Sequence, residues 1–297
     1  MIKYRKYFYT LSLSLVLTSV IALAIFGLRF GIDFTGGSMM EVLFTGSSRP
    51  SHEAVRDAMS DFELGEIVIQ DSGEGGMILR FREVNETLHQ NLLNKVKTLG
   101  DLEERRFETV GPVIGEEVKQ KTFWAVGLAV VLMFFYVAWA FRRVSFPVNS
   151  WVYGVIAVIT LCHDVLITLG LFALLGYISH VEVGVAFVAA LLTIWGYSVN
   201  DTIVIFDRIR ENVLRQGSVF DFREVIDKSV RQTFVRSLNT SLTVLFALLA
   251  IFFFGGETVR YFVLALIAGV VVGSYSSLFI ASPLLFSWHM LKRRRNA

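Results

Sequence analysis

Residues 183–208 read VGVAFVAALLTIWGYSVNDTIVIFDR, and this stretch decides the fold class. Up to Phe206 it is almost entirely apolar, with Asp201 as its one acidic residue and Asn200 beside it. A helix of roughly 20 apolar residues crosses a hydrocarbon core of about 30 Å, because each residue rises by about 1.5 Å. The stretch is therefore predicted to be a transmembrane helix that carries a carboxylate.

Five further apolar runs of similar length bring the predicted number of spans to six. They cover residues 8–28, 123–141, 148–175, 234–254 and 261–285. The whole chain of 297 residues is 54% hydrophobic, with a mean hydropathy of +0.57, which is too apolar for an ordinary water-soluble domain. The first run follows basic residues as a signal peptide does, but its length and the lack of a small-residue cleavage site favour an uncleaved span.

The distribution of Lys and Arg predicts the orientation, because cytoplasmic loops carry an excess of both. Six spans place four basic clusters on one side, at residues 3–6, 142–143, 208–236 and 292–295. On the other side, residues 176–182 hold no Lys or Arg, and the connection before the sixth span holds Arg260 alone. We therefore expect a multi-pass protein with its N- and C-termini in the cytoplasm.

Residues 29–122 are predicted to form a folded domain outside the cytoplasm. Apolar residues alternate there with polar ones as strands require, at residues 38–44, 66–70, 77–81 and 102–110. Ser51 can cap a helix that starts at His52, a second amphipathic helix covers residues 86–99, and residues 74–76 suit a hairpin turn. The order strand, helix, two strands, helix, strand predicts a ferredoxin-like α+β domain.

The predicted fold is therefore a six-helix membrane bundle with a small extracytoplasmic α+β domain. Its parts are a first span at residues 1–28, the α+β domain at 29–122 and a five-span bundle at 123–297, with a cytoplasmic loop at 207–233 and a basic C-terminal tail. The outer domain has no His/Cys cluster, nucleophile elbow or phosphate loop, so we expect no enzymatic activity. The single cysteine, Cys162, excludes a disulfide within the chain.

Ionisable residues inside spans are costly and are the first candidates for function. Asp201 lies five residues before the inner end of the fourth span, and Arg236 opens the fifth, so two adjacent antiparallel helices place them at similar depth. Desolvation and a nearby positive charge act in opposite directions on a carboxyl group, so helix movement can load and release a proton. We predict that Asp201 and Arg236 are proton-coupling residues; the alternatives are a structural hydrogen bond for Asp201 and snorkelling of Arg236 to the interface.

Five other polar residues in the spans are predicted to support this pair. His163 and Asp164 lie near the centre of the third span; Asn200 lies in the fourth, and Asn239 and Thr240 lie in the fifth. Adjacent helical residues point about 100° apart, so His163 and Asp164 should not both face one site directly. A proton relay and a structural contact both stay open for them. Two candidate ligands are too few for a metal site, so we expect no bound metal. We also expect no organic cofactor and take protons to be the coupling ion.

Several segments together resemble the SecF subunits of the bacterial preprotein translocase, in the SecD/SecF family of the RND superfamily. The segments are GIDFTGG at 31–37, VGP at 110–112, HDV at 163–165, GYSVNDTIV at 196–204, FDRIREN at 206–212 and RSLNTS at 236–241. They extend over nearly the whole chain in the family's order, and the segment around Asp201 is highly specific.

The resemblance implies a role in protein export. It implies pairing with SecD in the bacterial cytoplasmic membrane and use of the proton motive force to draw preproteins through the SecYEG channel. It also assigns the proton-responsive carboxylate to Asp201 and the arginine of the fifth span to Arg236. The expected partners are SecD, SecYEG, YajC, the translocating preprotein and membrane lipids, with no nucleic acid.

Two other function classes compete with this hypothesis. One is an RND-type, proton-driven exporter of small molecules or lipids, although one outer domain of about 90 residues and six spans leave little room for a drug-binding cleft. The other is a non-transducing scaffold of the translocase. Replacing Asp201 by Asn distinguishes a transducer from a scaffold, and drug sensitivity with normal secretion in a deletion strain would favour an exporter.

Overall fold

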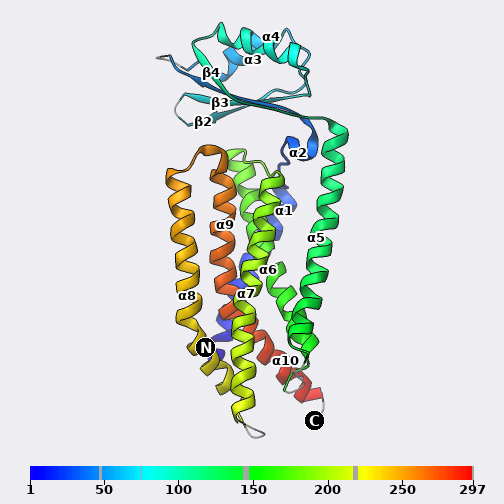
Figure 1. Ribbon diagram of the computed structural model, residues 1–297, viewed down its shortest axis with the longest axis vertical. Coiled ribbons are helices and arrows are strands. Elements are labelled where there is room, and N and C mark those ends of the chain that lie inside the picture. The colour runs from blue at the N-terminus through cyan, green and yellow to red at the C-terminus, as the bar shows by residue number, and fades with distance from the viewer. Residues whose placement is uncertain (47–48, 74, 143–146, 217–219, 296–297) are drawn as a thin grey trace. The chain divides into compact units, whose positions relative to one another are not determined.

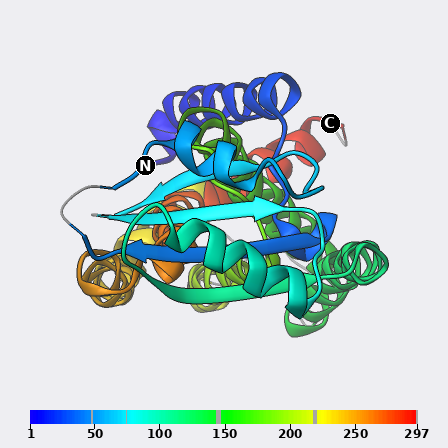
Figure 2. The same cartoon turned by 90° about the horizontal axis from the view of Figure 1, so that it is seen from above.

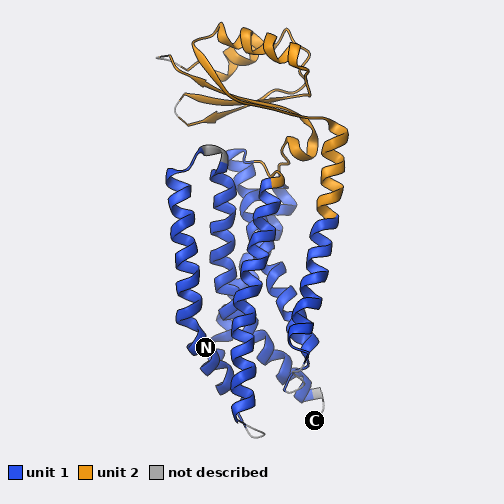
Figure 3. Cartoon of the chain, in the orientation of Figure 1, with its two compact units in different colours: residues 1–28, 124–181, 186–297 blue, residues 29–123, 182–185 orange. Residues whose placement is uncertain are grey.

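The structure is a computed structural model that describes the chain except residues 47–48, 74, 143–146, 217–219 and 296–297. It divides into two compact units (Figure 3). The membrane unit comprises Met1–Leu28, Trp124–Val181 and Ala186–Ala297. The outer unit comprises Arg29–Phe123 together with Glu182–Val185, a short segment from the connection between two membrane helices.

Six helical segments in the described part of the chain are long and apolar enough to cross a membrane, as predicted (Figure 1). The elements that build them are η1 (Ile2–Tyr4), α1 (Arg5–Phe26), α5 (Pro112–Ala140), α6 (Ser150–Ser179), α7 (Val185–Gln216), α8 (Phe222–Phe254), α9 (Glu257–Ser276), η2 (Ser277–Ala281) and α10 (Ser282–Arg295). The sixth span runs through the last three of these elements, and η2 is one π-helical turn. The chain is therefore a multi-pass membrane protein.

The core of the membrane unit lies around α6 and α7. Tyr153 is fully buried, stacks on Phe141 with ring centroids 4.8 Å apart and meets Phe206 edge to face at 5.2 Å. Half of the apolar stretch of α6, of α7 and of the sixth span is buried, whereas α1, α5 and α8 leave most of theirs exposed. The second group therefore surrounds the first and offers its outer faces to lipid or to a partner.

Residues 207–233, expected as a cytoplasmic loop, are mostly helical where the structure describes them. Helix α7 continues to Gln216 and α8 starts at Phe222, well outside the apolar runs. Ile209 and Val213 are buried on α7, and Val225 and Ile226 are buried on α8, so the apolar residues of this charged region share helix faces. Hydropathy alone marks the end of an apolar run; it does not mark the end of an amphipathic helix.

The outer unit contains a four-stranded antiparallel sheet with the order β2-β3-β1-β4. The strands are β1 (Gly37–Phe44), β2 (Val68–Ser72), β3 (Gly76–Phe81) and β4 (Leu102–Val110), and the helices are α2 (Ile32–Thr35), α3 (His52–Met59) and α4 (Glu86–Lys97). Helices α3 and α4 cover one face of the sheet (Figures 1 and 2). This topology confirms the predicted ferredoxin-like α+β unit.

Local sequence explains the ends of these elements. Ser51 Oγ accepts a hydrogen bond from Ala54 N (3.2 Å) at the start of α3, and Asn85 Oδ1 accepts one from Leu88 N (2.9 Å) at the start of α4. The hairpin between β2 and β3 turns through Gly75, which has a φ of +82°. Residue 74 of the predicted turn lies outside the described residues.

Candidate functional site

Asp201 lies on the buried side of α7 and is only 7% exposed. Ser237 on α8 donates a hydrogen bond from its Oγ to Asp201 Oδ1 at 2.7 Å. The other carboxylate oxygen, Oδ2, is buried and has no hydrogen-bond partner among the residues that the structure describes. An unsatisfied buried oxygen on an acid is costly unless it binds a proton or a partner that arrives later. Asp201 therefore has one anchored oxygen and one available oxygen.

Arg236 lies on α8, next in sequence to the residue that bonds Asp201. Its side chain is exposed on the surface of the membrane unit, while Ser237 points inward and is 1% exposed. The positive charge of Arg236 acts on Asp201 electrostatically, but no ion pair joins the two in the part of the chain that the structure describes. The structure thus brings the two predicted residues to adjacent helices and makes the direct contact through Ser237.

Asp164 is a second buried carboxylate, 1% exposed, at the centre of the membrane unit. Its Oδ2 accepts hydrogen bonds from Ser198 Oγ on α7 (2.6 Å) and Ser276 Oγ on α9 (2.8 Å), and its Oδ1 bonds His163 Nδ1 (2.9 Å). Both oxygens are therefore satisfied, in contrast to Asp201. Asp164 joins α6, α7 and the sixth span at one point.

His163 takes part in the same cluster. It is 8% exposed, and its ring lies nearly parallel to that of Tyr275 on α9, with centroids 6.5 Å apart. The expectation that His163 and Asp164 would not face one site is corrected here, because their side chains bend toward each other and hydrogen-bond directly. His163 Nε2 is buried without a partner among the described residues.

Hydroxyl groups connect the helices around these two acids. Ser277 Oγ donates to the backbone carbonyl of Ser198 (3.1 Å) and shares a hydrogen bond with Thr202 Oγ1 (3.0 Å). On the α8 side, Tyr197 OH donates to Ser241 Oγ (3.0 Å), which shares a 2.6 Å hydrogen bond with Ser274 Oγ. This network links α7, α8 and the sixth span on both sides of Asp201.

Two glycines let the sixth span approach α7 closely enough for these bonds. A Cβ at position 273 would lie 3.0 Å from Ser198 Cβ, and one at position 269 would lie 2.2 Å from Ile194 Cδ1. Close helix approach through small residues spaced by four is common in membrane bundles. The π-helical turn that follows, η2, begins with Ser277, so an irregular helix segment lies beside the two acids.

The other predicted supporting residues lie outside the buried network. Asn200 is exposed and lines an open hollow of about 400 Å³ between α5 and α7. Asn239 and Thr240 are exposed on α8, where Thr240 Oγ1 donates to the carbonyl of Arg236 (3.0 Å). These three side chains line the outside of the membrane unit.

Sequence reasoning missed the serines that hold both carboxylates. Ser198 precedes Asp201 by three positions and therefore shares its helix face, and Ser237 follows Arg236 directly. The cluster Ser274, Ser276 and Ser277 falls within an otherwise apolar span. Hydroxyl groups at such spacing in a span were the available signal.

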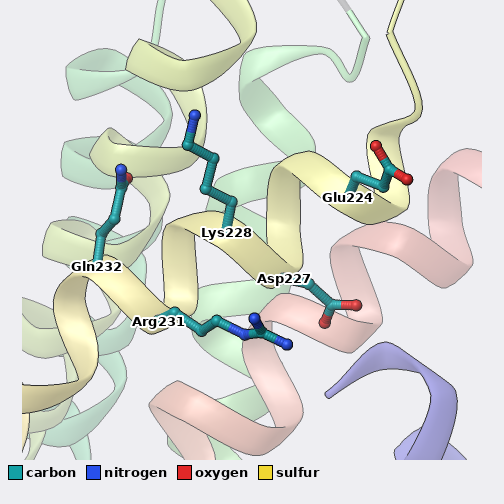
Figure 4. Close-up of a pocket in the computed structure, with 5 residues that line it drawn as sticks. All are labelled: Glu224, Asp227, Lys228, Arg231 and Gln232. Atoms are coloured by element: carbon teal, nitrogen blue, oxygen red, sulfur yellow. The ribbon is translucent and has the colours of Figure 1, made fainter.

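A separate hollow of about 450 Å³ lies at the start of α8, lined by Glu224, Asp227, Lys228, Arg231 and Gln232 (Figure 4). In Figure 4, Lys228 and Gln232 point away from Asp227 and Arg231. Asp227 Oδ1 accepts a hydrogen bond from Ile2 N (2.9 Å) and so ties α8 to η1. The five side chains come from one helix and form no arrangement suited to catalysis. Among the described residues, no group of three or more His, Cys, Asp or Glu could hold a metal ion.

Curated relatives match almost the whole chain. The chain is 43% identical over 303 aligned residues to the protein translocase subunit SecF of Thermobaculum terrenum, with 97% of this chain and 93% of that protein covered. It is 37% identical to the SecF subunit of Anaerolinea thermophila, with 96% and 92% covered.

Solved structures of SecDF match the fold. The SecDF of Thermus thermophilus, described as a translocon-associated membrane protein, superposes with a TM-score of 0.84 at 32% identity, and SecDF in a super-membrane-facing form superposes with 0.70 at 31%. These matches cover 97% and 99% of this chain, and the chain spans 38% and 39% of the SecDF chains.

Two family models also match. The model of the SecD/SecF GG motif matches residues 21–47, and the model of the C-terminal part of protein export membrane protein SecD/SecF matches residues 89–291, more than half of the chain. The chain therefore belongs to the SecD/SecF family of protein-export membrane proteins.

Proposed function

We propose that the chain acts as the SecF subunit of a bacterial protein-export translocase, and that it pairs with SecD and uses the proton motive force to promote preprotein movement through SecYEG. The observation that carries the proton role is the unequal state of the two oxygens of Asp201. Oδ1 is held by Ser237 on the neighbouring helix, and Oδ2 is buried without a partner among the described residues. A proton is a ligand small enough to reach such an oxygen inside a packed helix bundle.

The proposed mechanism couples the charge of Asp201 to the contact between α7 and α8. When Asp201 is ionised, the Ser237 hydroxyl and the nearby positive charge of Arg236 both favour a close approach of the two helices. Protonation at Oδ2 removes the charge and with it the attraction toward Arg236. Moving one charge across the membrane potential yields about 2.3 kcal/mol per 100 mV, enough to shift a two-state equilibrium of modest cost. Protons serve as the coupling ion, with no organic cofactor, metal or catalytic activity.

SecD is the partner that the outer face of α8 fits best. Arg236, Asn239 and Thr240 are exposed on this face inside an apolar span, where contact with lipid is costly. The solved relatives are named SecDF, and this chain spans only 38% of one such chain. The rest of a SecDF chain is long enough to contain a SecD part, and we propose that SecD covers this face of α8. SecYEG, YajC, the translocating preprotein and membrane lipids are further proposed partners; nucleic acid is not.

The proposed location is the bacterial cytoplasmic membrane with both termini in the cytoplasm. The basic residues of the α7–α8 region and of α10 support this orientation, since cytoplasmic segments are rich in Lys and Arg. The outer unit then faces the side on which an exported chain emerges. Neither a small-molecule exporter nor a passive scaffold is favoured by an observation of its own.

Asp201→Asn tests the proton role in membrane vesicles that contain SecD and SecYEG. The control is Asp207→Asn, because Asp207 is exposed six positions further along α7 and undergoes the same chemical change. We expect the Asp201→Asn variant to assemble with SecD and to lose most of the stimulation of export by the proton motive force, while the control keeps it. Full stimulation in the Asp201→Asn vesicles would remove the proton role and favour a scaffold.

A further inference from the structure

The connection between α6 and α7 is held by the residues that follow α1. Gly31 N donates a hydrogen bond to Val183 O (2.9 Å), and Val183 N donates one to Arg29 O (2.8 Å). Phe30 and Val183 thus form an isolated parallel bridge between segments more than 150 positions apart. All of these residues belong to the outer unit, although the chain leaves Val183 directly into a membrane helix.

Asp33 extends this contact to the first residue of α7. Its Oδ2 accepts a hydrogen bond from Val185 N at 2.8 Å, which satisfies one of the amide groups that the start of a helix leaves unpaired. A carboxylate at this place also interacts favourably with the positive end of the helix dipole. The fit leaves no room for a side chain at position 184, where a Cβ would lie 2.3 Å from Asp33 Oδ2. The cap on α7 is therefore supplied by a residue 152 positions earlier.

An ion pair ties the same connection to the sheet. Arg80 on β3 places its Nε 3.0 Å from Glu182 Oε2, and the side chains are only 15% and 19% exposed. Burial raises the pKa of Glu182, and the charge of Arg80 opposes that rise. Partly buried pairs of this kind are screened less by salt than surface pairs. The residue before the helix is thus fixed to the sheet, just as the first residue of the helix is fixed to Asp33.

The glycines at the end of the same segment bring it against α5. Gly36 has a φ of +71°, and a Cβ there would lie 2.7 Å from Pro112 Cα at the start of α5. A Cβ at Gly115 on α5 would lie 2.9 Å from Gly36 N. Residues 31–37 therefore contact the start of α7 through Asp33 and the start of α5 through Gly36. These residues are the GIDFTGG segment, which contributes to the family resemblance and to which the sequence alone assigns no function.

We propose that residues 31–37, with Arg80 and Glu182, form a coupling joint that fixes the start of α7 to the outer domain, and that Asp33 is its central positioning residue. Movement of the outer domain then reaches α7, the helix that carries Asp201, through Val185. Movement that starts at Asp201 reaches the outer domain by the same route. The contribution of the joint to export rests on the proposed function; its effect on the start of α7 does not.

The direct test is hydrogen–deuterium exchange of the full chain, assembled with SecD in membrane vesicles. We expect Asp33→Ala to speed exchange of the first amides of α7 by about tenfold or more, because the cap is lost. Asp33→Asn should stay close to the unchanged protein, since an amide oxygen can still accept from Val185 N. Asp57→Ala is the control, because Asp57 is exposed on α3 of the outer unit, outside residues 31–37, and undergoes the same chemical change.

Export measured in the same vesicles separates this inference from the proton role. We expect Asp33→Ala to lose stimulation by the proton motive force, the single charge reversals Arg80→Glu and Glu182→Arg to weaken it, and their combination to restore much of it. Unchanged exchange at the start of α7 in Asp33→Ala overturns the joint, whatever happens to export. Faster exchange with full export stimulation keeps the structural cap and refutes its part in coupling. If Asp201→Asn alone leaves export intact, the proton role falls and the exchange result still decides the joint.

Discussion

Replacing Asp164 by Ala should destabilise the membrane unit strongly, because three side chains lose their shared partner. Asp164 accepts from Ser198 and Ser276 and bonds His163, and it is 1% exposed. Measured side-chain hydrogen bonds in membrane bundles average about 0.6 kcal/mol and reach about 1.7 kcal/mol. Three such bonds give an expected loss of about 2–5 kcal/mol.

The assay is unfolding of the full chain in mixed detergent micelles with a rising fraction of denaturing detergent, followed by circular dichroism. Ser198→Ala and Ser276→Ala should each lose about 0.6–1.7 kcal/mol, since each removes one bond to Oδ2. Ser14→Ala is the control, because that serine is exposed and its hydroxyl donates to the carbonyl of Leu11 in its own helix. A loss for Asp164→Ala within about 0.5 kcal/mol of the control would refute the view that this carboxylate holds the three helices together.

Two further predictions test packing in the spans and electrostatics outside them. Gly269→Ala should lower the free energy of unfolding by about 1–3 kcal/mol in the same assay, because the new Cβ would collide with Ile194. Gly196→Ala should change it little, since a Cβ there would have nothing within 4 Å; equal effects of the two variants would contradict the packing argument. Hydrogen bonding to His52 and the charge of Arg49 hold the pKa of the exposed Asp71 below its ordinary value, so its small stabilisation is present at neutral pH and is lost as the pH falls through that lowered value. Asp71→Asn should therefore melt slightly earlier than the unchanged protein at pH 7, and this difference should shrink as the pH falls through the lowered pKa of Asp71; a difference that stays constant in acid would contradict the argument.

The spans and the outer domain were predictable because each depends on a local pattern. The length of an apolar run specifies a span. In the domain, the alternation of apolar and polar residues specifies the strands, and helical spacing with capping residues such as Ser51 specifies the helices. The continuation of α7 to Gln216 was not predictable from hydropathy, because that part is amphipathic. Its apolar residues lie on one helix face and alternate in sequence with charged residues, so the mean hydropathy of this part is as low as that of a loop.

The sequence predicts how far along their helices the candidate residues lie, but it only partly predicts the direction in which each side chain points. Counting residues from the ends of two spans places Asp201 and Arg236 on adjacent helices at similar height, but it leaves the rotation of each helix about its axis undetermined. Neighbouring positions differ by about 100°, and the structure turns Ser237 rather than Arg236 inward. The same argument failed for His163 and Asp164, because side chains with two free dihedral angles can bridge a separation that the helix geometry suggests is too wide.

The contacts of α7 support the proposal that Asp201, rather than Asp164, is the carboxylate that changes its protonation state. Helix α7 is fixed at Val185 by Asp33 and at Ser198 by Asp164, and both of these carboxylates have polar partners. Oδ2 of Asp164 accepts hydrogen bonds from serines on two other helices, so a change at this oxygen would loosen three helices at once. Protonating Oδ2 of Asp201 breaks no hydrogen bond described here, because only Oδ1 is bonded. Under the proposed function, a proton binds and leaves at Asp201 while the two fixed points preserve the helix, and its effect is directed toward α8.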